Sequence, residues 1–194
     1  MDLSGSIPAL VTPFKGGEVD LDALASLVDF QVDEGSGGIV ACGTTGEAST
    51  MTLEERATVV RAVVQRVHGR IPVITGTGSN DTRATIAQTR AAKEWGADAA
   101  LVVTPYYNKP TQEGLFLHYK AIAEATELPV ILYNVPGRTS VSFTPETVAR
   151  VAKLPRVVAI KEASGSLDFV TQLRTLCDIP ILSGEDSLTF PMIA

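Results

Sequence analysis

The sequence predicts a (β/α)8 barrel that is incomplete at its C-terminal end, with about seven strands present. Short apolar runs alternate with amphipathic stretches at intervals of roughly thirty residues, as strands and helices do in parallel α/β folds. A doubly wound open sheet shows the same repeat. The barrel is favoured because nearly every run ends on a polar or reactive residue, as at a barrel mouth, and because no GxGxxG motif follows the first run.

The predicted strands are continuous apolar runs, as expected for parallel strands that are covered on both faces. They cover residues 6–12, 38–42, 72–76, 99–104, 129–134, 157–161 and 180–184. A closed barrel needs eight strands and typically about 250 residues. We therefore expect residues 1–194 to form a single barrel domain that lacks the eighth strand–helix unit, with two unpaired sheet edges.

The stretches between the strands carry helix signals. Thr52 and Glu55 have the spacing of a capping box. Thr144 is expected to be an N-cap with Pro145 as the first helical residue. In a different stretch, Gly96 is expected to mark the end of the helix that precedes Gly96. The apolar stripe of the helix after Thr52 is expected to comprise four residues: Leu53, Val60, Val64 and Val67.

Composition and charge exclude several classes of function. The net charge of −6 and the isoelectric point near 4.9 argue against nucleic-acid binding. There is no apolar run of membrane-spanning length and no basic start of a signal peptide. Cys42 and Cys177 are far apart, and His68 and His118 do not cluster with other ligand types, so no metal site is expected. We expect a soluble cytoplasmic protein that acts on small molecules.

Lys161 ends the apolar run VVAIK, an unusual place for an ammonium group. A lysine at a strand end commonly reaches solvent. At a barrel mouth, however, a desolvated lysine has a lowered pKa, and its neutral amine can attack a ketone. The resulting imine makes the neighbouring carbon acidic, which is aldolase chemistry that needs neither a metal nor another cofactor.

Three further motifs follow other strands. In CGTTGE, the amides around Thr44 and Thr45 could bind a small anion, although an ordinary turn is an equally good interpretation. Tyr133 ends a strand near the lysine and is suited to acid–base work, and Arg138 is suited to a carboxylate. The aromatic pair in TPYYN, residues 106–107, is suited to a subunit interface.

The motifs CGTTGE, TPYYN, YNVPGRT and IKEASG, in this order, resemble those of the dihydrodipicolinate synthase family. This family belongs to the pyruvate-dependent class I lyases, which include N-acetylneuraminate lyase. The resemblance runs from Ser6 to the end of the chain. It implies that Lys161 forms a Schiff base with pyruvate, that Thr44 and Thr45 hold the pyruvate carboxylate, and that the enamine adds to L-aspartate 4-semialdehyde. The product is 4-hydroxy-tetrahydrodipicolinate, a precursor of diaminopimelate and lysine.

The resemblance also implies roles for the remaining site residues. Tyr133 would act as acid and base near the imine. Tyr107 would cross a dimer interface, and Thr44 would link it to Tyr133 as a proton relay. Arg138 would bind the carboxylate of the second substrate, and Gly184 would line the pyruvate pocket. Members of the family are commonly homotetramers built as dimers of dimers, and they continue through an eighth strand and further C-terminal helices.

The family's lysine-binding allosteric site is matched only weakly. Asn80 and Tyr106 fit it. Members that lysine inhibits have histidines where this chain has Leu53 and Arg56, and a glutamate where it has Ala84. We therefore expect weak or absent feedback inhibition by lysine.

Two other functions stay open at this point. One is a sibling aldolase, such as N-acetylneuraminate lyase or an aldolase for a keto-deoxy sugar acid, with the same lysine. Arg138 and the second threonine of GTTGE favour the synthase. The other is a truncated, non-catalytic barrel, which the missing eighth unit favours and the presence of Lys161, Tyr133 and Thr44 opposes.

Overall fold

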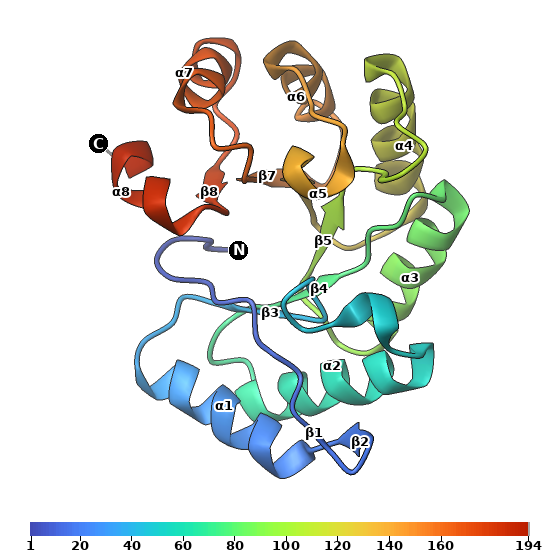
Figure 1. The fold of residues 1–194 in the computed structure, drawn as a ribbon, viewed down its shortest axis with the longest axis vertical. Coiled ribbons are helices and arrows are strands. Elements are labelled where there is room, and N and C mark those ends of the chain that lie inside the picture. The colour runs from blue at the N-terminus through green and yellow to red at the C-terminus, as the bar shows by residue number, and fades with distance from the viewer. Residues whose placement is uncertain (194) are drawn as a thin grey trace. The chain divides into compact units, whose positions relative to one another are not determined.

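The computed structural model describes residues 1–193, which belong to two compact units. Unit 1 comprises residues 1–77 and 90–101, and unit 2 comprises residues 78–89 and the chain from Val102 onward. Figure 1 shows the elements of both units in chain order.

Six strands form the main sheet and follow one another in sequence order. Adjacent strands pair in parallel within unit 1 and again within unit 2. Most of their residues are buried, as the continuous apolar runs predict. The strands are β3 (Ile39–Ala41), β4 (Val73–Gly76), β5 (Ala99–Val103), β6 (Val130–Asn134), β7 (Val157–Glu162) and β8 (Ile181–Ser183).

The prediction of a strand at residues 6–12 is wrong, because this segment makes only one isolated β-bridge, between Ala9 and Val40. The Val40 amide donates to the Pro8 carbonyl at 2.9 Å, and the Gly37 amide donates to the Ser6 carbonyl at 2.8 Å. The two acceptors are two residues apart but the two donors are three apart, so a regular ladder cannot continue. The short antiparallel hairpin that follows, β1 (Phe14–Lys15) with β2 (Glu18–Val19), has no counterpart in the sequence prediction.

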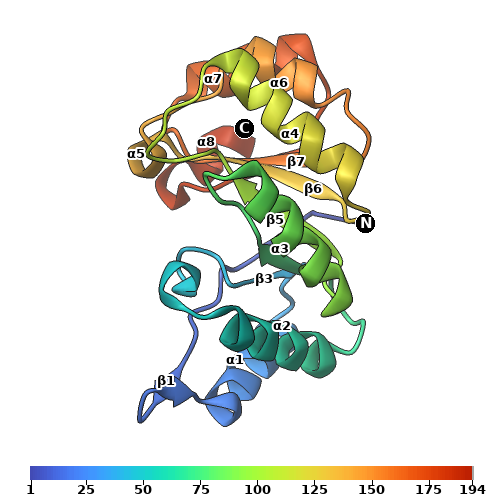
Figure 2. The ribbon, with the colours of Figure 1, turned by 90° about the vertical axis from the view of Figure 1, so that its right-hand side faces the viewer.

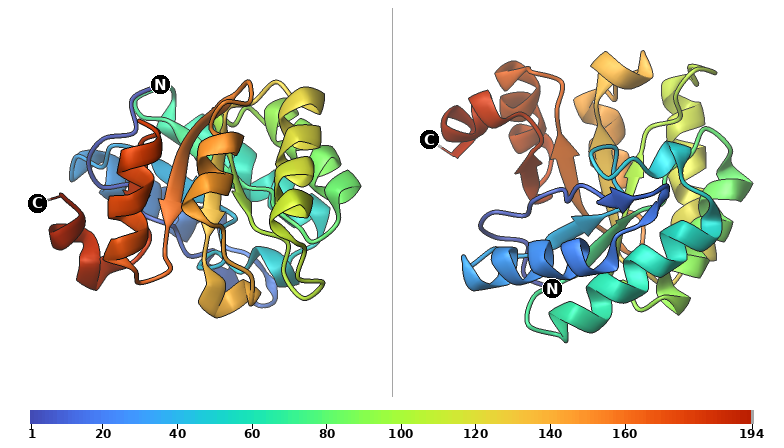
Figure 3. Two further views of the ribbon diagram at one scale, coloured as in Figure 1. Left: turned by 90° about the horizontal axis from the view of Figure 1, so that it is seen from above. Right: turned by 60° about the horizontal axis from the view of Figure 1, so that its bottom comes forward.

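In unit 1, helices α1 (Leu21–Asp33) and α2 (Leu53–Val67) lie side by side, as the right-hand view of Figure 3 shows. A short 3-10 helix, η1 (Ala48–Thr50), precedes α2. The predicted capping box is confirmed: the Thr52 hydroxyl accepts from the Glu55 amide, and the Glu55 carboxylate accepts from the Thr52 amide. The buried stripe of α2 differs from the prediction, because Leu53 is exposed and Val64 is only half-buried. Its buried residues are Arg56, Val59, Val60, Val63 and Val67.

In unit 2, helices cover the strands that carry the site. Figure 2 shows α4 (Gln112–Ala125), α6 (Pro145–Val151) and α7 (Leu167–Leu176) along β6 and β7. The predicted cap at Thr144 is confirmed, since its hydroxyl accepts from the Thr147 amide with Pro145 in the first turn. The other helices of this unit are α5 (Pro136–Thr139), η2 (Asp186–Leu188) and α8 (Thr189–Ile193), whereas α3 (Thr82–Glu94) begins in unit 2 and ends in unit 1. As predicted, Gly96 lies just after α3, at a φ of +94°.

Candidate active site

Lys161 is the penultimate residue of β7 and is half-buried, whereas its neighbours Ile160 and Glu162 are fully buried. Successive side chains of a strand point to opposite faces of the sheet. Lys161 therefore shares a face with Ala159, and Glu162 points the other way. Burial lowers the pKa of the Lys161 amine below its ordinary value, and the nearby carboxylate of Asp186 acts in the opposite direction.

Tyr133 lies directly opposite Lys161 on the neighbouring strand β6, as its register partner. The Lys161 Nζ lies 4.9 Å from the centroid of the Tyr133 ring. Burial raises the pKa of the Tyr133 phenol, and the charge of Arg138 acts against this rise. The phenol therefore keeps its proton at neutral pH and can donate it to an oxygen or nitrogen that reacts at Lys161.

Gly184 follows β8 and gives the lysine its space. Its amide donates to the Glu162 carbonyl at 2.7 Å, so its backbone is held against β7. A Cβ at this position would lie 2.9 Å from Lys161 Cε and 2.8 Å from Ala163 Cβ. Only glycine permits this approach with the lysine in its present position.

Arg138 is exposed and lies on α5, the single turn that follows β6. The turn begins at Pro136, where a proline is favourable because the first helical residue needs no amide hydrogen bond. The guanidinium is close enough to influence the Tyr133 phenol and is open to solvent. Lys161, Tyr133, Gly184 and Arg138 thus come together within unit 2.

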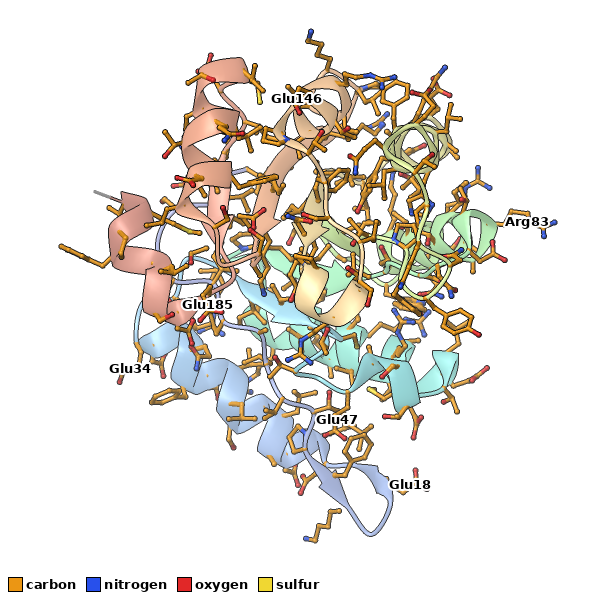
Figure 4. All side chains as sticks on the ribbon, turned by 45° about the horizontal axis from the view of Figure 1, so that its top comes forward. Glu18, Glu34, Glu47, Arg83, Glu146 and Glu185 are labelled. Carbon is orange, nitrogen blue, oxygen red and sulfur yellow. The ribbon has the colours of Figure 1, made fainter. Side chains whose placement is uncertain are left out.

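Thr44 and Thr45 lie in unit 1, in a tight turn after β3, and both are exposed. The Thr44 carbonyl accepts from the Glu47 amide at 3.1 Å, and Glu47 itself has a positive φ of 59°. Glu47 is among the residues labelled in Figure 4. The neighbouring Gly46 carbonyl accepts from the buried Thr12 hydroxyl at 2.8 Å, which fixes the base of the turn. Both threonine side chains are therefore carried by a well-anchored loop.

The residues predicted for the interface and the allosteric site are on the surface or take structural roles. Tyr107 is 88% exposed and has a φ of +73°, and Tyr106 is 39% exposed. Asn80 is half-buried, and its backbone carbonyl accepts a hydrogen bond from Asn108 Nδ2 at 3.0 Å. Arg56, where lysine-inhibited members have a histidine, is buried and donates to the Gly76 carbonyl.

The sequence analysis missed two buried polar residues, Asn134 and Glu162, each of which directly follows a site residue. Asn134 Nδ2 donates to Glu162 Oε2 at 2.8 Å. The signal was present in the sequence, since YN and KE each place a second polar residue at the end of an apolar run. It was not recognised because successive residues of a strand do not share a face.

Within residues 1–193, no group of three or more His, Cys, Asp and Glu side chains could hold a metal ion, and none of the helices has the length and apolar character of a membrane span. His118 is buried, its Nδ1 lies 2.8 Å from the Thr82 hydroxyl, and burial lowers its pKa to about 4.

The parallel strand–helix repeat and the strand-end lysine beside a tyrosine define a barrel-type α/β protein with a lysine-centred site. The model of the dihydrodipicolinate synthetase family matches residues 2–194, and the chain belongs to this family. It is 59% identical over 192 residues to the 4-hydroxy-tetrahydrodipicolinate synthase of Geotalea uraniireducens and 57% identical to that of Geobacter sulfurreducens. The alignments cover 98% of this chain but 66% of each relative, so the chain spans slightly less than two thirds of their length.

Solved structures of the family have the same fold. Dihydrodipicolinate synthase from Aquifex aeolicus superimposes with a TM-score of 0.94 at 48% identity, covering 97% of this chain and 66% of that one. The chloride-inhibited enzyme from Acinetobacter baumannii, complexed with pyruvate, gives a TM-score of 0.96 at 50% identity and covers 99% of this chain and 67% of that one. The predicted barrel class and the family resemblance are therefore confirmed.

Proposed function

We propose that the chain carries the Schiff-base chemistry of a 4-hydroxy-tetrahydrodipicolinate synthase, which condenses pyruvate with L-aspartate 4-semialdehyde in diaminopimelate and lysine biosynthesis. The observation that carries this proposal is the half-buried amine of Lys161, which has a lowered pKa and lies beside the Tyr133 phenol. The names of the relatives support the choice of substrates.

The chemistry follows from the amine. Neutral Lys161 Nζ attacks C2 of pyruvate and, after proton transfers, water leaves to give the imine. Tyr133 would donate a proton to the departing oxygen and take one back later. Loss of a proton from C3 gives an enamine, and this carbon forms the new bond to the aldehyde carbon of the second substrate. Arg138 would hold the carboxylate of that substrate.

The remaining assignments rest on the family pattern. Thr44 and Thr45 would bind the pyruvate carboxylate, and Tyr107 would contribute from a second copy in a dimer of dimers. One solved relative is described as a monomeric variant, so assembly is a separate question from fold. By the same pattern, the full protein would act in the cytoplasm, and residues 1–194 would form most of a single barrel domain.

The decisive test is to trap the imine. The protein is mixed with pyruvate and reduced with borohydride, and the modified peptide is located by mass spectrometry. A pyruvyl adduct on Lys161 is the expected result. The proposal would be overturned if no adduct formed on this chain and none formed on the same sequence extended by the C-terminal third of a relative. A turnover assay without borohydride, in which the protein is given pyruvate together with either L-aspartate 4-semialdehyde or N-acetylmannosamine, then separates the synthase from a sugar-acid aldolase.

We expect the rate of adduct formation to rise with pH through the pKa of Lys161 and then level off. Only the neutral amine attacks, so the rate falls as protonation increases. Because burial lowers the pKa of Lys161, the rise should lie at lower pH than the rise for a lysine side chain in a short solvated peptide. The Asp186 charge raises the Lys161 pKa, so Asp186→Asn should move the profile further down in pH. A profile that coincides with that of the peptide lysine would contradict the desolvation argument.

A further inference from the structure

Behind Lys161 and Tyr133, the opposite face of the same two strands carries a fully buried pair of polar side chains. Glu162 and Asn134 are both 0% exposed, and they are register partners one rung beyond Lys161 and Tyr133. A buried carboxylate is costly unless each oxygen is hydrogen-bonded, and a well-packed apolar pair would serve stability as well or better. The presence of this pair therefore needs a reason other than stability.

The hydrogen bonds of the pair have only one consistent arrangement. The two carboxylate oxygens of Glu162 each accept one bond, from Asn134 Nδ2 at 2.8 Å and from the Ser164 amide at 2.6 Å. Asn134 Oδ1 accepts from the Phe143 amide at 3.2 Å, so its Nδ2 must face the carboxylate. Asn134 Nδ2 also donates to Ser142 Oγ at 3.5 Å. The donors and acceptors that join Glu162 and Asn134 are thus complementary, and a change at one residue leaves a mismatch at the other.

This network fixes the three segments that carry the site residues. Glu162 links the end of β7, directly after Lys161, to the end of β6, directly after Tyr133. Through the Phe143 amide, Asn134 also holds the chain where it returns from the loop that carries Arg138. The backbone repeats these links, since the Ala163 amide donates to the Asn134 carbonyl at 2.8 Å.

We propose that Glu162 and Asn134 are positioning residues, which hold the Lys161 amine in register with the Tyr133 phenol and the Arg138 loop. Neither side chain shares the face of the sheet on which Lys161 and Tyr133 lie, so neither acts on the substrate directly. When imine formation is measured, the test of this proposal rests on the proposed function. A second measurement that does not depend on pyruvate is therefore needed.

The structure offers an exchange test. Glu162→Gln leaves one amide donor facing another, because a glutamine has one acceptor oxygen where the carboxylate has two. Asn134→Asp places two carboxylates side by side. The double variant Asn134→Asp/Glu162→Gln restores the pairing: the new amide donates to the new carboxylate, which still accepts from Phe143, and the glutamine oxygen accepts from Ser164. Glu146→Gln, an exposed glutamate at the start of α6 in the same unit, is the matched control (Figure 4).

Two rates are measured for each variant that remains folded by circular dichroism. The first is borohydride-trapped pyruvyl adduct on Lys161. The second is acetylation of Lys161 by trace acetic anhydride relative to the exposed Lys153, which needs no pyruvate. Small displacements of a reacting group cost up to about a hundredfold in rate. We expect each single variant to slow trapping by about tenfold or more and to alter the relative acetylation of Lys161, the double variant to recover most of both, and Glu146→Gln to match wild type.

The outcomes separate the two proposals. If wild type traps no pyruvate, the proposed function fails and the acetylation comparison alone decides the positioning role. If wild type traps pyruvate and the single variants match it in both rates, the positioning role is overturned, even when they melt at a lower temperature. If the double variant is as slow as the single variants, the effect does not come from the hydrogen-bond pairing, and this also overturns the proposal.

Discussion

Replacing Lys161 by methionine is expected to abolish the pyruvate adduct and, at the same time, to stabilise the fold. The amine is the nucleophile that attacks pyruvate in the proposed chemistry, so its loss removes the covalent step altogether. The side chain is half-buried, and burial disfavours its charged form. Methionine fills a similar volume without a charge to desolvate.

The sign of the stability change depends on pH. Since the pKa of Lys161 is lower in the folded protein, the unfolded chain binds more protons below the ordinary lysine pKa. Protonation therefore favours unfolding, and this cost is fully present below the folded-state pKa and disappears above the ordinary one. The gain from Lys161→Met should be largest at neutral pH and should vanish in strongly alkaline solution.

Urea unfolding of wild type and Lys161→Met at a series of pH values measures this gain. Lys161→Arg is the control, because it keeps a cation at the strand end but cannot form the imine. It should lose the adduct without gaining stability. If Lys161→Met is less stable than wild type at neutral pH, the lysine is not desolvated in the way that the structure indicates.

The strands and the lysine–tyrosine pair could be predicted from sequence for the same physical reason. Continuous apolar runs identify buried parallel strands, and consecutive strands in such folds tend to be neighbours. The ends of β6 and β7 were therefore expected to meet, and Tyr133 and Lys161 are indeed register partners. The segment at residues 6–12 has an equally apolar run, but the spacing of its hydrogen bonds to Gly37 and Val40 does not match a regular strand pairing, which no hydrophobic pattern reveals.

The support behind the site could not be predicted in this way. The partners of Glu162 and Asn134 include the backbone amides of Ser164 and Phe143, and backbone amides carry no sequence signal. Gly184 was singled out only through the resemblance of SGED to the family, because the need for a glycine there comes from two close contacts, with Lys161 Cε and with Ala163 Cβ. Periodicity predicts which face is buried, whereas such local contacts depend on the final packing.

That close approach predicts the second large effect. In Gly184→Ala, the new methyl group would lie 2.9 Å from Lys161 Cε and 2.8 Å from Ala163 Cβ, closer than carbon atoms tolerate. The lysine has to leave its place opposite Tyr133, and the backbone after β8 has to shift from Ala163. Overpacking of this kind typically costs about 1–3 kcal/mol of stability. We expect a loss of this size in urea unfolding, together with a large fall in the rate of adduct formation.

The two clashes can be separated with a second substitution. Ala163→Gly removes the methyl group that Gly184→Ala would strike, but it leaves the conflict with Lys161 Cε. The double variant should therefore recover part of the stability, less the backbone cost of a new glycine, while adduct formation stays slow. Gly137→Ala is the control, since a Cβ at Gly137 meets nothing within 4 Å. If Gly184→Ala forms the adduct at the wild-type rate, the position of the lysine beside Gly184 does not matter for its reaction. If the double variant recovers the wild-type rate, it is the contact with Ala163 that requires a glycine at position 184, and not the contact with Lys161.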